Sequence, residues 1–464
     1  MLGQLAVFVG GWSLEAAEAL CPDLDVFTLL AQLVQKSLVV AEEYEDGGDT
    51  RFRLLETIRQ YGRDRLLESD TAVQARDRHL AYYAQFAEAG EFNFWGPGRL
   101  EWVDRCELEL DNFRAAMQWG LDHNPISVLR LASVTGFYWA ARGLITEGRR
   151  WVEVALNAVT ALPNEPGKAS QASVAARARG LIALSQMNYG DGHYQTGLAA
   201  CHEAVRLYRE LGDPFGLGMA LGTLGNMAAF QGDSDLAERA LLEAVQIGHA
   251  LENPALLCFA TEVLGQYVYM PRGDLEAAWR STEESMQYAR LAGMTWAVAQ
   301  GELIFARIAA LKGEFEVARV HTQISQEIAA GLRDTLLLNM AVFRLGDIEM
   351  QAGNLAESQR YLSQSVLVFQ EIGQRAFVSH GLESFAFIAK RNEQPERAAR
   401  LLAAAEALRE RLNTSLIAVM RLDDEYDTTI AWLHERLDDA TYEAIWSEGC
   451  GISIDQAVAL ALEE

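Results

Sequence analysis

The sequence predicts an all-α protein whose main part is a right-handed superhelical α-solenoid of paired helices, with a repeat of about 40 residues. Three observations support this fold class. A turn residue recurs at nearly constant spacing, small residues recur at fixed distances from that turn, and strong helix formers dominate a chain of 464 residues with only 9 prolines. Because half of the residues are apolar, an array of this length can bury a large core.

Residues 1–70 follow a different pattern, and we expect a small winged-helix domain there. Ser13 and Asp25 are placed to cap helices, and Gly10–Gly11 is expected to interrupt the helical structure before Ser13. A turn at residues 45–49 then joins two strand-like segments as a hairpin. The predicted elements are helices at 14–20 and 26–36, strands at 38–44 and 50–55, and a helix at 58–67. Helices followed by a hairpin wing make a winged helix.

Linker helices are expected over residues 71–124, and helix pairs over residues 125–412. The recurring turn residues are Gly192, Gly232, Gly273, Gly313 and Gly353, with Glu393 in the equivalent place. Their spacings are 40, 41, 40, 40 and 40 residues. A more diverged unit with Gly143 as its turn residue comes first, so the array has about seven helix pairs. The prolines of segment 163–167 predict a loop inserted after that first unit.

Small residues occupy the places where paired helices must approach each other closely. Five residues after each turn residue come Gly197, Ala237, Ala278, Ala318, Ser358 and Ala398. Twelve residues after it come Ala204, Ala244, Ser285, Ser325, Ser365 and Ala405. Seven residues before it come Ser185, Gly225, Gln266, Ala306, Gly346 and Ala386, and only Gln266 departs from the pattern. This constant register indicates a close helix crossing within each pair.

Residues 413–464 are expected to form capping helices, because the end of a repeat array needs a polar cover. Trp432 and Trp446 would supply apolar surface toward the last repeat, and a helix break is expected at Gly449–Gly451.

The register also predicts which side chains face inward along the first helix of each pair. Positions one and four after the small residue, and six before it, share one face at helical spacing. The candidates for a ligand groove are Arg179, Gln186, Tyr189, Asn226, Tyr267, Arg307, Asp347 and His380. The same face also includes Arg130, Phe137, Met219, Met270, Gln300, Met340, Met350, Phe387 and Lys390. The alternative stays open that the aromatic and methionine members only pack and that the polar ones are solvated.

The small-residue positions, together with Leu224-Gly225-Asn226 and Gly232-Asp233, resemble the tetratricopeptide repeat in a long-helix form. The resemblance covers roughly residues 125–412. It implies a recognition scaffold whose concave surface is lined by the first helices, and a protein, peptide or small-molecule inducer as the partner.

A second resemblance covers the two ends of the chain. The segments 5–17, 54–61 (Leu-Leu-Glu-Thr-Ile-Arg-Gln-Tyr), 109–116 (Glu-Leu-Asp-Asn-Phe-Arg-Ala-Ala) and 398–406 resemble bacterial signal-transducing ATPases and transcriptional regulators of the NB-ARC or STAND class. The resemblance implies a winged helix and a repeat sensor that regulate a nucleotide-binding domain, in cis or in trans. Since the sequence has no Gly-x-x-x-x-Gly-Lys-Ser/Thr loop, this chain is expected to be the sensor half of a larger system, either cut from it or encoded separately.

Catalytic chemistry and cofactors are not expected. The nearest metal-like cluster, His193, Cys201 and His202, lacks the spacing of a zinc site, and Cys201 falls at a packing position. The acidic pairs Asp423–Asp424 and Asp438–Asp439 are interpreted as solvated faces. The chain is therefore expected to be no enzyme, with no catalytic residue, no bound metal and no cofactor.

The net charge of -26 disfavours broad contact with nucleic acid. An alternative function is nevertheless a DNA-binding transcriptional regulator that acts through the winged helix, because arginines cluster around its hairpin. They are Arg51, Arg53, Arg59, Arg63 and Arg65. The expected recognition helix, residues 26–36, has only Lys36 as a basic residue, which disfavours DNA contact. No apolar run is long enough for a membrane helix, so no membrane partner and a cytoplasmic location are expected.

Overall fold

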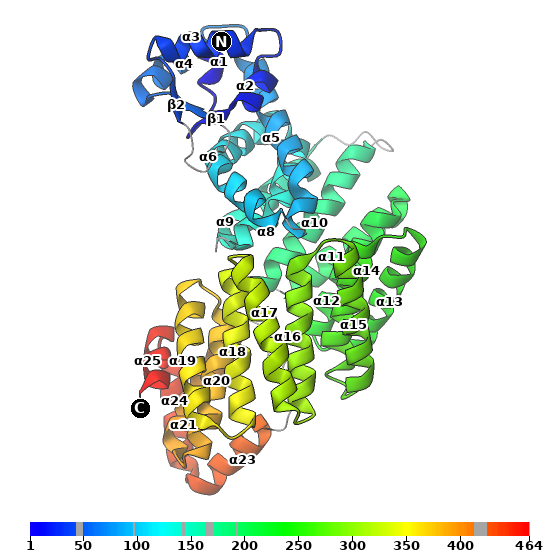
Figure 1. Ribbon diagram of the computed structural model, residues 1–464, viewed down its shortest axis with the longest axis vertical. Coiled ribbons are helices and arrows are strands. Elements are labelled where there is room, and N and C mark those ends of the chain that lie inside the picture. The colour runs from blue at the N-terminus through cyan, green and yellow to red at the C-terminus, as the bar shows by residue number, and fades with distance from the viewer. Residues whose placement is uncertain are drawn as a thin grey trace. The chain divides into compact units, whose positions relative to one another are not determined.

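The structure, a computed structural model, describes residues 1–42, 50–95, 98–141, 144–162, 170–191, 194–412 and 425–463. It contains two compact units, one of residues 1–94 with 98–184 and the other of residues 185–464 with the short segment 95–97. Figure 1 labels their elements along the chain. The hairpin turn 45–49, the turn residues Gly143 and Gly192, and the loop 163–167 lie outside the described residues.

Short helices and a small sheet open the first unit. The elements are α1 (Leu2–Leu5), β1 (Trp12–Ser13), α2 (Leu14–Leu20), α3 (Val26–Gln35), β2 (Val40–Glu42), β3 (Arg51–Arg53) and α4 (Glu56–Leu67). The central strand β3 pairs antiparallel with β1 on one side and β2 on the other. The predicted helices and hairpin are confirmed, although the strands are shorter than expected. Strand β1 was not predicted, because two residues are too few to show alternation.

The predicted caps of this region are confirmed. The Ser13 hydroxyl accepts the N–H of Ala16 at 3.2 Å, and the Asp25 carboxylate accepts the N–H of Thr28 at 3.2 Å. Gly11 lies at φ 115°, and a Cβ there would come within 2.8 Å of the Phe52 carbonyl oxygen. Glycine is therefore required where the chain passes beside β3.

Six further helices belong to the described part of the first unit. They are α5 (Ala72–Trp95), α6 (Arg99–His123), α7 (Pro125–Val134), α8 (Gly136–Ala141), α9 (Ile145–Thr160) and most of α10 (Gln171–Asp191). Helices α5 and α6 occupy the expected linker region. Buried aromatic side chains join them, since the rings of Tyr83 and Phe113 are fully buried and pack edge to face at 5.6 Å between centroids.

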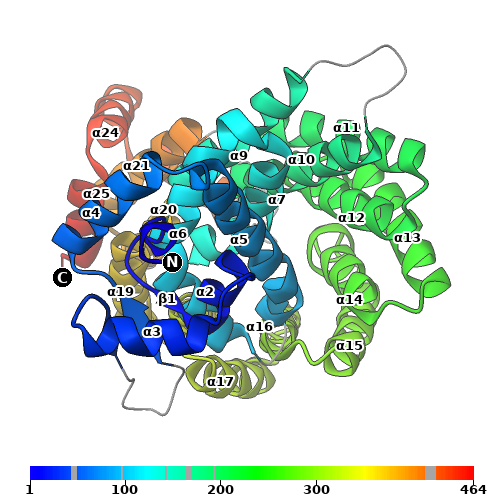
Figure 2. The ribbon, with the colours of Figure 1, turned by 90° about the horizontal axis from the view of Figure 1, so that it is seen from above.

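The second unit is a tandem array of antiparallel helices, as predicted. It contains α11 (Tyr194–Leu211), α12 (Pro214–Phe230), α13 (Ser234–Ala250), α14 (Pro254–Val263) with the π-helix η1 (Leu264–Tyr269), α15 (Leu275–Leu291), α16 (Thr295–Leu311), α17 (Phe315–Gly331), α18 (Thr335–Gln351), α19 (Leu355–Glu371), α20 (Arg375–Arg391) and α21 (Pro395–Leu412). In the view from above, the first helices α12, α14 and α16 lie on the inner side of a curved path, and α13, α15 and α17 on the outer side (Figure 2).

The predicted register of small residues is confirmed by burial. All twelve residues five and twelve positions after the turns are buried, from Gly197 to Ala405. Two hydroxyls also bond across the crossing: Ser185 donates to the Gly197 carbonyl at 2.9 Å, and Ser358 donates to the Gly346 carbonyl at 2.8 Å. The first and second helices of a pair therefore meet at these positions, and a larger side chain has no room there.

The recurring turns share one backbone conformation. The four described turn glycines, from Gly232 to Gly353, have φ between 76° and 85°. Glu393, which stands in the equivalent place without being glycine, also has a positive φ of 56°. A second series of positive-φ residues joins one pair to the next: Gly212, Glu252, Gly293, Arg333 and Gly373.

One position of the register is corrected by the structure. The small residue of the third described pair is Gly265 rather than Gln266, because an added Cβ at Gly265 would lie 3.1 Å from the Ala278 carbonyl oxygen. Gly225 has the same relation to the Ala237 carbonyl oxygen, also at 3.1 Å. The reason is the π-helix η1, which winds one extra residue into this helix and so accounts for the single spacing of 41.

Among the described residues, three helices cover the last repeat: α23 (Glu425–Arg436), α24 (Asp439–Gly451) and α25 (Ile454–Leu462). Leu433, Ile445 and Val458 share one buried cluster with Leu402 of α21. The predicted break at Gly449–Gly451 falls at the end of this segment, because α24 ends at Gly451 and α25 begins at Ile454. Gly449 also allows close packing, since a Cβ there would lie 2.6 Å from the Arg400 carbonyl oxygen. Residues 413–424 lie outside the described residues.

In the part of the chain that the structure describes, no helix has both the length and the apolar character needed to cross a bilayer.

Candidate functional site

The predicted inward-facing residues are distributed over the first helices. Arg179 and Gln186 lie on α10, on either side of the division between the two units. Within the second unit, the candidates follow one another along the first helices of consecutive pairs: Asn226 on α12, Tyr267 on η1, Arg307 on α16, Asp347 on α18 and His380 on α20. The side chain of Tyr189 lies outside the described residues.

These side chains are more enclosed than an open concave surface requires. Arg307 and Asp347 are only 6% and 5% exposed, and Gln186, Asn226, Tyr267 and His380 are partly buried. Neighbouring first helices cover them because the repeats stack closely. Polar groups buried to this degree must be satisfied by protein, water or ligand.

Asp347 is held by two neighbouring repeats. Its Oδ2 pairs with Arg344 Nη1 at 3.1 Å on the same helix, and its Oδ1 accepts the Ser384 hydroxyl of α20 at 3.4 Å. An acidic side chain thus has a fixed position between two consecutive first helices.

Two of the candidates have a packing role. The Tyr267 ring lies 4.7 Å from the Phe230 ring, and the His380 ring packs edge to face on Phe343 at 5.0 Å. For these two residues the structure supports the alternative interpretation, in which aromatic side chains of the inner face stabilise the stack.

Three amide side chains of consecutive first helices have buried carbonyl oxygens without a hydrogen-bond partner. They are Asn226 Oδ1, Gln266 Oε1 and Gln300 Oε1. Gln266 and Gln300 are 8% and 7% exposed. The sequence pattern placed Gln266 at a helix crossing, but the extra residue of η1 places it one residue after Gly265, as Asn226 follows Gly225. The spacing of 41 was the signal that could have identified it.

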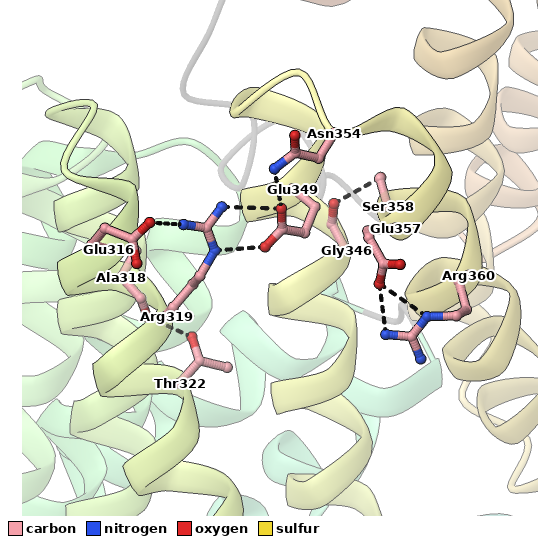
Figure 3. Close-up of polar contacts among 10 residues, drawn as sticks. All are labelled: Glu316, Ala318, Arg319, Thr322, Gly346, Glu349, Asn354, Glu357, Ser358 and Arg360. Carbon is pink, nitrogen blue, oxygen red and sulfur yellow. Dashed lines mark hydrogen bonds and ion pairs between the residues drawn. The ribbon is translucent and has the colours of Figure 1, made fainter.

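Ion pairs also fix the outer helices against the inner ones (Figure 3). Arg319 of α17 donates through Nε to Glu349 of α18 at 2.6 Å and through Nη1 to Glu316 at 2.5 Å. Asn354 donates to the second Glu349 oxygen at 2.7 Å. Hydrogen bonding from Arg319 lowers the pKa of Glu349, so this buried carboxylate stays ionised at neutral pH.

The arginines that suggested DNA contact are largely neutralised within the first unit. Arg51 pairs with Glu109, and the other ion pairs are Arg53–Glu42 at 2.5 Å, Arg59–Glu56 at 2.7 Å and Arg65–Glu68 at 2.6 Å. Only Arg63 of the five has no ion pair among the described residues. Arginines already paired with carboxylates attract a phosphate backbone less strongly.

A buried polar network joins the small sheet to the linker helices. Glu109 of α6 accepts from Arg51 and, at 2.6 Å, from the Tyr83 hydroxyl. Asn112, one turn later, donates to Glu109 at 2.7 Å and to the Gly11 carbonyl at 2.8 Å. The segment 109–116, so far singled out by resemblance alone, therefore has a structural role in holding β3 and the chain before β1 on α6.

The cysteine and histidine positions give no support for metal chemistry. Cys201 is fully buried against the Ser185 hydroxyl, and burial raises the pKa of its thiol to about 12. His193 lies outside the described residues, and His202 is exposed. Among the described residues no three His, Cys, Asp or Glu side chains come together as a metal site would require.

Comparison with known proteins gives partial relatives. No family model matches the chain. A protein of Mycobacterium tuberculosis named as an HTH-type transcriptional regulator is 34% identical over 266 residues, which are 55% of this chain and 29% of that protein; a Mycobacterium bovis protein of the same name matches equally. An uncharacterised M. tuberculosis protein is 40% identical over 99 residues, or 19% of this chain and 25% of its own length. The chain thus spans less than a third of these relatives.

Solved structures share the fold at low identity. A STAND protein with a tetratricopeptide repeat sensor from Pyrococcus horikoshii aligns with 97% of this chain and 64% of its own, at a TM-score of 0.54 and 16% identity. A Rap protein complexed with competence and sporulation factor aligns with 73% of this chain and 99% of its own, at a TM-score of 0.54 and 13% identity. The Rap conjugation gene regulator of plasmid pLS20, in complex with the Phr* peptide, gives a TM-score of 0.52 at 12% identity over 73% of this chain and 95% of its own. The predicted solenoid of tetratricopeptide-like helix pairs is confirmed.

Proposed function

We propose that this chain is the non-catalytic sensor region of a STAND-type signalling protein, and that an inducer binds along the inner helices of its repeats. One observation carries the proposal: an amide, a guanidinium and a carboxylate, those of Asn226, Arg307 and Asp347, stand at the same inward position of different repeats. Such a row can bind an extended ligand through several separate contacts.

The comparisons favour a peptide among the possible inducers, which also include a protein or a small molecule. Two of the structures that share the fold are complexes with a peptide or with competence and sporulation factor. A third is a STAND protein with a repeat sensor. The mycobacterial relative named as a transcriptional regulator favours a role in transcription control. We place the chain in the cytoplasm on the same grounds.

The relay would pass through the N-terminal region, which we interpret as a winged helix, to a nucleotide-binding domain in cis or in trans. The Glu109–Asn112 network supports this step, because it attaches the small sheet to α6 through buried hydrogen bonds. No cofactor is assigned to this chain. The coding sequence upstream tests the relay directly: an adjacent phosphate-loop domain is expected, and a free-standing gene without one would count against it.

Binding by substituted chains tests the sensor role. Once pull-down or peptide pools identify a ligand, Asn226→Ala and Arg307→Ala are each expected to weaken it by about 1–3 kcal/mol, as loss of buried or charge-assisted hydrogen bonds does. Circular dichroism would verify that both variants remain folded. The exposed Glu283 on α15 is a suitable control for substitution to Ala. Equal losses in all three variants would place recognition elsewhere.

A second candidate function, DNA binding through the N-terminal region, draws on the name of the mycobacterial relative. It predicts affinity that falls steeply with added salt, because phosphate contacts release counterions. The paired arginines make this function the weaker candidate. Absence of binding to any duplex at about 50 mM salt would eliminate it.

A further inference from the structure

Three hydrogen-bond acceptors on two neighbouring first helices of the repeat array have no donor among the described residues. They are the carboxyl of Glu262 on α14, the amide oxygen of Gln266 on η1 and the amide oxygen of Gln300 on α16. Gln266 and Gln300 are more than nine-tenths buried, and their oxygens have no hydrogen-bond partner. Glu262 likewise has no hydrogen bond or ion pair among the described residues. We call these three residues the acceptor layer.

Two apolar clusters show where the acceptor layer lies along the axes of α14, η1 and α16. Cys258 of α14 shares one cluster with Ala297 of α16. Met270 shares a second cluster with Ile304 of α16. Glu262 lies one helical turn after Cys258, and Gln266 lies one turn after Glu262 and one turn before Met270. On the neighbouring helix, Gln300 lies between Ala297 and Ile304. Because side chains three or four residues apart share a helix face, the three acceptors fall between the two clusters.

The repeat register brings Glu262 and Gln300 to facing positions. The equivalent residues of the repeat before are Gly222 and Phe259, where an added Cβ on the glycine would lie 2.7 Å from the phenylalanine ring. The equivalent residues two repeats later are Phe343 and His380, whose rings lie 5.0 Å apart. In the pair formed by Glu262 and Gln300, the same contact would join a carboxyl to an amide.

The electrostatics of Glu262 agree with the lack of a partner. Glu262 is half-buried, and burial raises the pKa of its carboxyl to about 7. No cation among the described residues opposes this effect. A buried carboxylate without a donor is costly, and so is a buried amide oxygen without one. All three groups therefore require donors from outside the protein.

We propose that the acceptor layer binds a primary ammonium group, supplied by a lysine side chain or by the free amino terminus of a peptide. An ammonium has three N–H donors and no acceptor, which matches three acceptors of which one carries negative charge. The inference rests on the proposed function, because it names the group of the inducer that the inner face recognises. It also gives the π-helix a purpose, since the extra residue is what places Gln266 in the layer.

Binding of designed peptides to the full chain tests the proposal. The probes are three fluorescent nonapeptide pools without Arg: acetylated with a central Lys, unacetylated with a central norleucine, and acetylated with a central norleucine. Fluorescence polarisation should show at least tenfold tighter binding of one ammonium pool than of the neutral pool. The pool that gains identifies a side chain or an amino terminus as the source.

Glu262→Gln should abolish this advantage and leave the affinity for the neutral pool unchanged, whereas Glu283→Gln should behave as the unmodified chain. Equal affinity of the unmodified chain for all three pools, or an advantage that survives Glu262→Gln, would overturn the proposal.

A titration with n-butylammonium separates this proposal from the proposed function. The carboxyl carbon resonance of Glu262, assigned by its loss in Glu262→Gln, should shift saturably with n-butylammonium and not with n-butanol. If no peptide pool binds but this shift occurs, peptide sensing fails while the ammonium site stands. An unmoved resonance would refute the site whatever the pools do.

Discussion

The backbone N–H of Val9 donates a 2.7 Å hydrogen bond to the side-chain oxygen of Asn112, 103 residues later in the sequence. The same amide group donates to the Gly11 carbonyl and to Glu109. One side chain therefore satisfies a backbone donor and a backbone acceptor that lie on the segment before β1. Buried backbone groups of this kind have no water to replace a lost partner.

Substitution of Asn112 by Ala is expected to destabilise the first unit by about 2–4 kcal/mol, because it leaves several buried groups unsatisfied at once. Urea unfolding followed by tryptophan fluorescence measures the loss. Asp122→Ala, an exposed change on the same helix, serves as the control and should alter stability by less than about 0.5 kcal/mol. A small effect of Asn112→Ala would mean that the network is not important for stability.

His79 is expected to make folding pH-dependent. Burial lowers the pKa of this histidine to about 4, while its ordinary value is 6.5, and it packs on Phe8 and Tyr83. Below pH 6.5 the unfolded chain binds a proton that the folded chain does not. Neutral His79 therefore makes no unfavourable contribution to the free energy of unfolding above pH 6.5. As the pH falls from 6.5 toward 4, the free energy of unfolding decreases by up to about 3 kcal/mol.

The measurement compares urea unfolding of the unmodified chain and of His79→Phe between pH 7 and 4.5. Other groups titrate in both proteins, so the difference between the two curves isolates His79. As the pH falls, the free energy of unfolding of the unmodified chain should decrease more than that of His79→Phe. Parallel curves would contradict the lowered pKa.

Overpacking at a helix crossing should destabilise the repeats. Ala237 and Ala318 are fully buried at equivalent crossings, so Ala237→Leu or Ala318→Leu is expected to cost at least about 1–3 kcal/mol. Thermal unfolding measures the change, and Ala330→Leu at an exposed position of α17 is the control. Unchanged unfolding of the buried variants would invalidate the register on which the inward-facing residues depend.

Arg333 offers the opposite test, because a substitution there should stabilise the protein. Its φ is 46°, whereas the equivalent Gly293 and Gly373 have φ of 69° and 73°. Relief of the left-handed strain exceeds the entropy cost of glycine, so Arg333→Gly is expected to gain roughly 0.5–1 kcal/mol in thermal unfolding. Arg333→Ala keeps the strain and should gain nothing. Equal behaviour of the two variants would mean that the backbone conformation is not the cause.

Sequence periodicity was sufficient to predict the fold of the repeats. Small residues at a close crossing are required by packing at every repeat, so the pattern from Gly197 to Ala405 was visible and its burial is confirmed. The exception was the pair containing Gly265, where a counting rule cannot tell at which residue an extra amino acid is inserted. Strand β1 was also missed, since a two-residue strand exists only through its pairing with β3.

The candidate site was less predictable, because the identity of a residue does not reveal its partner. The arginines from Arg51 to Arg65 resembled a basic surface, yet Arg51 pairs with Glu109, which is 58 residues away in the sequence. Tyr267 and His380 satisfied the inward register but pack on aromatic rings. Gln266 was regarded as a departure from the pattern, although the structure gives it one of the buried oxygens without a partner.

The π-helix in the third described pair resembles a dislocation in a crystal lattice, since it inserts one residue and leaves the order on both sides intact. The turn glycines resume their spacing of 40 immediately afterwards, at Gly273, Gly313 and Gly353. A length change confined to one helix can therefore rotate the side chains of a single repeat without disturbing its neighbours. A one-codon insertion could therefore change which residues of one repeat face inward, while the inward-facing residues of every other repeat stay in place.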